Sequence, residues 1–200
     1  MKKSALALFV LSMSFFTAAA QEAETVNVTR VTFLSPGISQ EIATGKSQTF
    51  FVAAYAYPSF AYNYSSSQGS SSSFSLDPGA EVHYRFYYNG TQRADNGKRV
   101  EMNSMNYLGP IAQVIFTKQP FTEHGLEESN RRPLTMIGAQ WGLQRNYNSR
   151  FCLDLNLGFG YQFGKNTEFD LSKREYTSSV TGRPALIADI KLGFWLNRRQ

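Results

Sequence analysis

The stretch Phe151–Phe163, FCLDLNLGFGYQF, has a large apolar side chain at every odd position and a small or polar residue at every even position. This period of two predicts a β-strand with one apolar face. The alternation continues for more than twice the about 5 or 6 residues of an ordinary strand. A strand of this length, rising about 3.3 Å per residue and tilted by roughly 40°, spans about 30 Å, the thickness of a bilayer's hydrocarbon core. We therefore predict that the apolar face meets lipid.

The first residues are typical of a secretory signal peptide. Two lysines precede a short apolar run, which ends in the small residues Ala18–Ala20. The pattern predicts cleavage before Gln21, so that residues 1–20 are removed and residues 21–200 form the mature domain. The apolar run is too short to span a bilayer as a helix.

The composition of the mature chain favours one all-β domain. No later run of apolar residues is long enough for a transmembrane helix, and a single cysteine cannot form an intrachain disulfide. Without the two leader lysines, 18 basic residues face 15 acidic ones, which leaves a net charge near +3. That balance is too weak to indicate nucleic-acid binding.

Further segments repeat the alternation with turn residues between them. Five such segments are Thr49–Tyr62, Ala80–Tyr88, Tyr107–Thr117, Leu134–Tyr147 and Pro184–Leu196. Pro58 and Pro110 weaken two of these patterns, because proline cannot donate to a ladder. The segment Val26–Ile42 contains Pro36 and Gly37, which suit the two central positions of a type II turn. Splitting it there brings the expected number of strands to eight.

The connections between these strands alternate in length. Short turns are expected at Gly45 and at Asn146–Arg150. Long polar loops are expected at Tyr64–Ser73, Lys118–Pro133 and Gly164–Arg183. Short turns on one side and long loops on the other are the arrangement of outer-membrane barrels. The connection Asn89–Asn106 is the exception, because it is long for a turn on the short side.

The mature chain resembles the small eight-stranded outer-membrane β-barrels of Gram-negative bacteria, the OmpA-type and opacity-type group. The signal peptide, the alternation, the loop asymmetry and the final strand carry this resemblance. The opening LSPGISQEIATGKSQTF is similar to the first hairpin of such proteins, with Glu41 just before a glycine-lysine turn. The resemblance implies an antiparallel up-and-down transmembrane barrel in the cell outer membrane, reached through the periplasm and the insertion machinery. It brings no catalytic motif.

The faces opposite the lipid are expected to form a polar interior that plugs the barrel. Charges there would be prohibitive against hydrocarbon and must be paired or hydrated. The expected interior residues are Glu41, Glu81, His83, Arg85, Gln113, Gln140, Gln144, Asp154, Asn156, Asp189 and Lys191. We predict ion pairs that link Arg85 and Lys191 to carboxylates among Glu41, Glu81, Asp154 and Asp189. A polar filling, and not a proton or ion path, is the preferred interpretation of this set.

The two histidines offer weak candidates for chemistry. His83 is flanked on its own face by Glu81 and Arg85, and a hydrogen-bonded interior histidine is favoured over a tuned base. His124 lies among glutamates, where a solvated loop is favoured over a weak metal site. A hydrolytic triad needs a base within reach of its nucleophile, and EVHYRF offers no serine near His83. We therefore predict no catalytic residue, cofactor or metal.

The sequence accordingly predicts a monomeric outer-membrane barrel with a structural or surface-interaction role and no open pore. Its expected partners are outer-membrane lipid, lipopolysaccharide and an extracellular partner at the loops. The alternatives are a lipid-modifying rim enzyme and a small-ligand-binding barrel. A soluble lipocalin-like barrel would show the same alternation, with its apolar faces inside.

Overall fold

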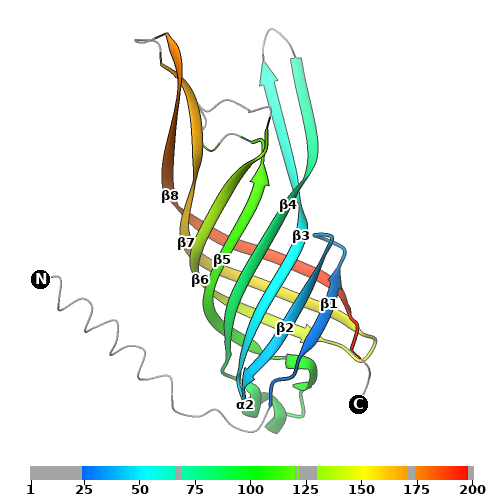
Figure 1. The fold of residues 1–200 in the computed structure, drawn as a ribbon. Helices are drawn as coiled ribbons and strands as arrows, with labels where there is room; N and C mark the ends of the chain where they lie inside the picture. The colour runs from blue at the N-terminus through cyan, green and yellow to red at the C-terminus, as the bar shows by residue number, and fades with distance from the viewer. Residues whose placement is uncertain (1–23, 66–68, 120, 122–129, 171–173, 198–200) are drawn as a thin grey trace, which may run out of the picture.

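The chain forms a closed ring of eight antiparallel strands that follow one another in sequence order (Figure 1). The computed structural model describes residues 24–65, 69–119, 121, 130–170 and 174–197. The signal-peptide prediction for residues 1–20 lies outside the described residues. The strands are β1 (Val28–Thr32), β2 (Gly37–Gly45), β3 (Gln48–Ser65), β4 (Gly69–Tyr87), β5 (Asn106–Thr117), β6 (Arg132–Asn146), β7 (Phe151–Asp170) and β8 (Glu175–Trp195). The predicted number and up-and-down order of the strands are confirmed.

The first predicted segment divides into two strands, with a turn at residues 33–36. The predicted turn centre was wrong in detail, because Gly37 is already the first residue of β2 and pairs with Thr32. A Cβ atom on Gly37 would lie 2.5 Å from the backbone oxygen of Ala54. This glycine therefore serves the close approach of β2 to β3.

Two of the three predicted long loops are largely paired strand. The serine-rich stretch Tyr64–Ser73 lies in β3 and β4 apart from residues 66–68, which lie outside the described residues. The stretch Gly164–Arg183 continues the β7–β8 ladder as far as the pair Asp170 and Glu175. A ladder of backbone hydrogen bonds needs no apolar face, so pairing extends beyond the point where alternation disappears from the sequence.

The remaining connections follow the prediction more closely. β5 ends at Thr117 and β6 begins at Arg132, which agrees with the predicted loop, although residues 120 and 122–129 lie outside the described residues. Asn146–Arg150 forms the predicted tight turn between β6 and β7. Pairing between β4 and β5 is interrupted at Gly109 and Pro110, which explains how a proline is tolerated there.

Most of the charged side chains on the alternating strands point inward, and most of the large apolar ones point outward. On β7 the outward Leu157 is 57% exposed, whereas the alternate residues Asp154 and Asn156 are buried. β8 behaves in the same way, with Leu186 82% exposed and Lys191 buried. On these two strands, charged side chains are therefore buried within the ring while large apolar ones are exposed outside it.

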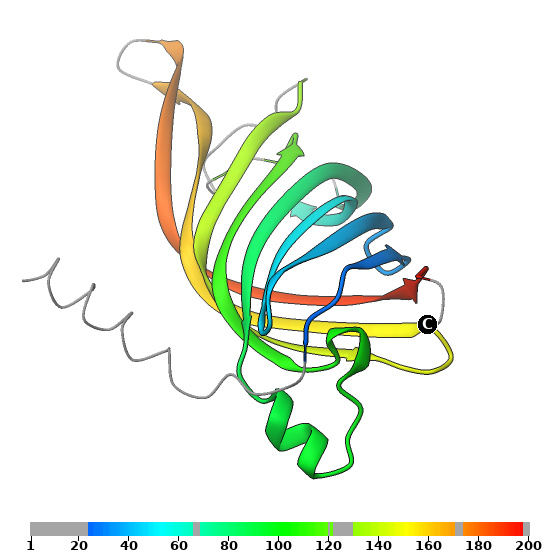
Figure 2. The same ribbon diagram turned by 60° about the horizontal axis from the view of Figure 1, so that its bottom comes forward.

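The long connection after β4 folds across one end of the ring (Figure 2). It contains the helix α2 (Gly90–Asp95) and the 3₁₀ turn η2 (Glu101–Asn103). Asn103 hydrogen-bonds both the backbone N–H and the backbone oxygen of Val26, at 2.9 and 2.8 Å, and so ties the start of the described chain to this connection. We call residues 90–105 the cap segment. None of the described helices is long and apolar enough to cross a membrane.

Candidate functional site

The predicted interior residues meet inside the ring. All of them are buried except Gln113 and Asp189, which are half-buried and line a cavity. They separate into one cluster around Arg85, next to the cap segment, and a second around Lys191. His83 lies between the two clusters.

Arg85 is the centre of the first cluster. Its guanidinium donates to Asp154 at 2.9 Å and to Gln144 at 2.6 Å. The guanidinium carbon lies 3.8 Å from the ring centroid of Phe51 and 4.3 Å from that of Tyr107. The cation is paired, hydrogen-bonded and placed between two aromatic rings, and these interactions offset the free-energy cost of removing it from water. The predicted pairing of Arg85 with an interior carboxylate is confirmed.

Glu41 has a partner that the sequence interpretation missed. Arg30 Nη2 lies 2.5 Å from its carboxylate, and Thr49 and Tyr87 donate hydroxyl hydrogen bonds to it at 2.8 and 2.5 Å. Arg30 lies in β1, which is too short for its alternation to stand out. Its position between the outward residues Thr29 and Val31 was the available signal.

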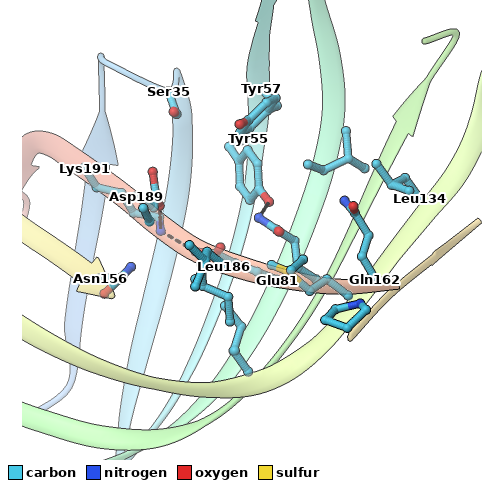
Figure 3. A pocket seen from close by; sticks show the side chains of 18 of the residues that line it. Ser35, Tyr55, Tyr57, Glu81, Leu134, Asn156, Gln162, Leu186, Asp189 and Lys191 are labelled. Atoms are coloured by element: carbon cyan, nitrogen blue, oxygen red, sulfur yellow. Dashed lines mark hydrogen bonds and ion pairs between the residues drawn. The ribbon is translucent and has the colours of Figure 1, made fainter. Parts of the chain in front are cut away.

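Lys191 organises the second cluster. Its ammonium group lies 2.9 Å from Glu81 and also contacts Asp189, which confirms the predicted pairing of Lys191. Glu81 comes from β4, across the ring from Asp189 and Lys191 on β8 (Figure 3). Two carboxylates therefore face one ammonium group in this cluster.

His83 connects the clusters through the hydrogen bonds of one ring nitrogen, Nδ1. Its Nδ1 atom lies 2.8 Å from Gln140 Nε2 and 3.2 Å from Arg85 Nη2. Arginine has only donors, so Nδ1 accepts and the ring proton belongs on Nε2, which faces Glu81 at 3.5 Å. The favoured interpretation of His83 as an interior histidine is consistent with this geometry. His124 lies outside the described residues.

A cavity of about 550 Å³ opens beside the second cluster. Tyr55 and Gln113, which are joined by a 2.5 Å hydrogen bond, and Glu81 contribute polar walls. Ile111, Met136 and Ile187 form an apolar wall opposite the ion pairs. Figure 3 shows side chains of both kinds pointing into this space. The volume falls in the range of small-molecule sites, about 300–1,000 Å³.

The cavity was not predicted from the sequence, which indicated a plugged interior. Glycines recur on the inward faces of β6 and β7, but none of them lines this cavity. A Cβ atom on Gly158 would lie only 2.3 Å from the backbone oxygen of Ala139, so this position accepts no side chain where the two strands approach. Gly158 therefore allows the close approach of β6 and β7, and the cavity lies among other residues.

The arrangement has the chemistry of a polar binding surface. Among the described residues, no group of three or more His, Cys, Asp and Glu side chains is placed to hold a metal ion. The cavity offers carboxylates, one ammonium and one guanidinium group, amides and two phenols, which can bind polar groups by hydrogen bonds and charge. Comparison of the chain with protein families, with curated proteins and with solved structures found no match.

Proposed function

We propose that this chain is an integral outer-membrane β-barrel with a structural or surface-interaction role and no open pore. The observation that carries the proposal is the inverted distribution of side chains. Arg85, Glu41 and Lys191 are buried within the ring, while residues such as Leu157 and Leu186 point away from it. A protein in water gains by burying its apolar faces, so this inversion fits a hydrocarbon solvent outside.

The length and aromatic content of the outer surface support the same proposal. β7 has 20 residues and β8 has 21, which is ample for a tilted transmembrane strand of about 9–11 residues. Tyr88 and Trp141 lie on the outward face, where the Trp141 indole donates to the Tyr88 hydroxyl at 2.7 Å. Exposed aromatic residues of this kind form the girdles at the edges of an apolar band.

The packing of the interior supports the absence of a pore. The Arg85 cluster crosses the ring from β4 to β7, and Gln144 joins it to Glu41 through a hydrogen bond of 3.3 Å. The cap segment covers the adjacent end, with Met105 and Asn103 buried. Side chains almost fill an eight-stranded barrel, so the cavity above this cluster is expected to be closed at one end.

The surface-interaction role rests on two paired arms. β3 with β4, and β7 with β8, extend beyond the strands that flank them. Their sequences are rich in serine, threonine and charged residues, and they also expose aromatic side chains such as Phe74 and Tyr176. With the loop after β5, these arms are the expected contact surface for an extracellular partner and for lipopolysaccharide. Among the alternatives, a small-ligand-binding barrel is favoured by the cavity, whereas the surroundings of His83 offer little to a rim enzyme.

Cell fractionation with heat-modifiable electrophoresis tests the proposal. Recovery with the outer membrane and a mobility shift between unheated and boiled samples are expected. Recovery in the soluble periplasm without such a shift would remove the membrane model.

A substitution on the outer face tests directly whether lipid or water surrounds the ring. Leu157→Arg should lower the free energy of unfolding by about 2–4 kcal/mol if the residue meets the bilayer interior. The matched control is Val180→Arg on the β7–β8 arm, where a residue already 76% exposed should tolerate the change within about 0.5 kcal/mol. Equal, small effects at both positions would mean that water surrounds Leu157.

A further inference from the structure

The wall of the ring has an opening between β3 and β8. The short strand β1 pairs with β8 only over Gly193–Trp195, and β2 pairs with β3 only as far as Tyr55. Beyond these positions the described residues of β3 pair with β4 alone, and those of β8 pair with β7 alone. We call this gap, above the turn at residues 33–36, the side opening.

Two backbone hydrogen bonds mark the floor of the side opening. Ala56 N–H donates to Pro36 at 2.8 Å, and Phe33 N–H donates to Leu192 at 2.9 Å. Backbone groups of alternate residues in a strand point to the same side. Ala56 on β3 and Leu192 on β8 use backbone groups that point toward the opening. Pro58 and Pro184 lie an even number of residues from Ala56 and Leu192, respectively, so their backbone faces the opening as well.

The two prolines suit strand edges that remain unpaired. An unpaired N–H group facing hydrocarbon costs several kcal/mol, and proline has none. A proline at the free edge also cannot donate to a new neighbouring strand. Their positions therefore favour a stable opening over one that closes by pairing β3 with β8.

The side opening joins the inner cavity to a second hollow on the outer surface. The outer hollow has a volume of about 470 Å³. The two share the lining residues Ser35, Tyr57, Asn156, Ala188 and Asp189, so they meet at the opening. Figure 3 shows Ser35 and Tyr57 on one side of the space and Asp189 on the other.

The two hollows differ in chemistry. The outer one is lined mainly by apolar side chains, among them Leu34, Leu157 and Trp141. The inner one, near the opening, presents the carboxylates of Glu81 and Asp189 against the single ammonium group of Lys191. Arg183, which also lines the cavity, lies further along β8, with its guanidinium 4.8 Å from the Phe121 ring centroid.

We propose that the side opening admits the polar head of a single-chain membrane amphiphile into the cavity while its hydrocarbon chain stays in the outer hollow. The excess of carboxylates near the opening selects a head that carries hydroxyl or amino groups and no negative charge. This inference rests on the proposed membrane location, because the chain must be supplied by the bilayer.

Tryptophan fluorescence measures this binding in the full-length mature protein reconstituted in phosphatidylcholine vesicles. The chain contains two tryptophans, of which Trp141 lines the outer hollow and Trp195 is buried inside the ring. A monoacylglycerol with a brominated chain should quench Trp141 with a saturable dependence on its mole fraction. A brominated alkyl sulfate of the same chain length should need at least about ten times the mole fraction, which corresponds to 1.4 kcal/mol of discrimination.

Substitutions at the junction separate binding from general contact with lipid. Ala188→Phe should abolish the saturable component, because Ala188 lies where the two hollows meet. The matched control, Ala80→Phe, makes the same change on the outward face of β4 and should leave the component intact. Asp189→Asn should reduce the discrimination against the sulfate, because it removes one of the two carboxylates.

The outcomes distinguish this inference from the membrane proposal. A folded, vesicle-inserted protein that shows only linear quenching, or that binds the sulfate as well as the glyceride, overturns the inference and leaves the barrel standing. Saturable quenching that persists in folded Ala188→Phe also overturns it. If Ala188→Phe does not fold, the inference is tested by the preference for the glyceride over the sulfate. That preference should be present in the wild type and reduced in Asp189→Asn, and any other result overturns the inference. A protein that does not insert at all refutes the proposed function instead.

Discussion

Replacing Arg85 with Met tests how strongly the interior depends on charge pairing. The substitution keeps an unbranched side chain between Phe51 and Tyr107 but removes the cation that pairs with Asp154. The Asp154 carboxylate then remains buried, with the Tyr107 hydroxyl at 2.8 Å as a remaining donor. Breaking a buried pair in this way costs about 3–5 kcal/mol of the free energy of unfolding.

A double substitution separates the lost charge from lost packing. Arg85→Met combined with Asp154→Asn leaves no unpaired charge, and the amide still accepts from the Tyr107 hydroxyl. Removing both members of a buried pair is often nearly neutral, so the double variant should regain about 2 kcal/mol or more over Arg85→Met. The control is Glu101→Gln, which breaks the surface pair with Arg99 at 2.6 Å and changes a side chain that is 69% exposed. Its cost should stay below about 1 kcal/mol.

Urea titration of the protein folded in lipid vesicles measures these differences. The unfolded fraction is read from the heat-modifiable band, and the free energy is extrapolated to zero urea. A loss below about 1 kcal/mol for Arg85→Met would refute the reasoning about its pairing. So would a double variant that is no more stable than Arg85→Met, because the cost would then come from packing alone.

Three further substitutions or labels test other parts of the ring. Asn103→Gly keeps the positive φ of 61° but removes both hydrogen bonds to Val26, so it should cost about 1–2 kcal/mol and speed proteolysis near Val26; unchanged proteolysis would contradict that role of the cap segment. The single cysteine, Cys152, is buried, so a maleimide should modify it far more slowly in the folded protein than in urea; equal rates would show an accessible interior. Gly158→Val places a side chain against the Ala139 oxygen and should lower the folded fraction in vesicles, and an unchanged urea midpoint would exclude that clash.

Strand number and the division of each strand into two faces could be predicted because they depend on local alternation. The choice of which face points inward rested on strand length and on the uninterrupted apolarity of one face. In β7 and β8 the outward apolar residues alternate with residues that are mostly polar or small, apart from Ile187 and Trp195, so the set that includes Asp154 and Lys191 could be grouped from the sequence. The pairing partners could not be assigned in this way. Whether Arg85 pairs with Asp154 or with Glu41 depends on the register and on the shape of the ring, which bring together side chains from distant strands.

Three features escaped prediction for different physical reasons. The arm segments that were predicted as loops, the serine run of β4 and residues 164–183 of β7 and β8, lack the continuous alternation that identifies a strand. Arg30 lies in a strand of 5 residues, where the pattern is too short to be distinguished from chance. The cavity is lined by side chains from distant strands, among them Tyr55, Gln113 and Lys191, and the space between them is a property of the closed ring.

The side opening follows from the unequal lengths of neighbouring strands. β1 has 5 residues and lies beside β8, which has 21, so most of one edge of β8 extends past the end of its neighbour. The same mismatch occurs between β2 with 9 residues and β3 with 18. Because the outward face of β8 remains apolar at Ile190 and Leu186, the exposed edge lies within the apolar surface and not beyond it. The early turn after β1 thus both completes the ring and connects its polar interior to the surface that we assign to lipid.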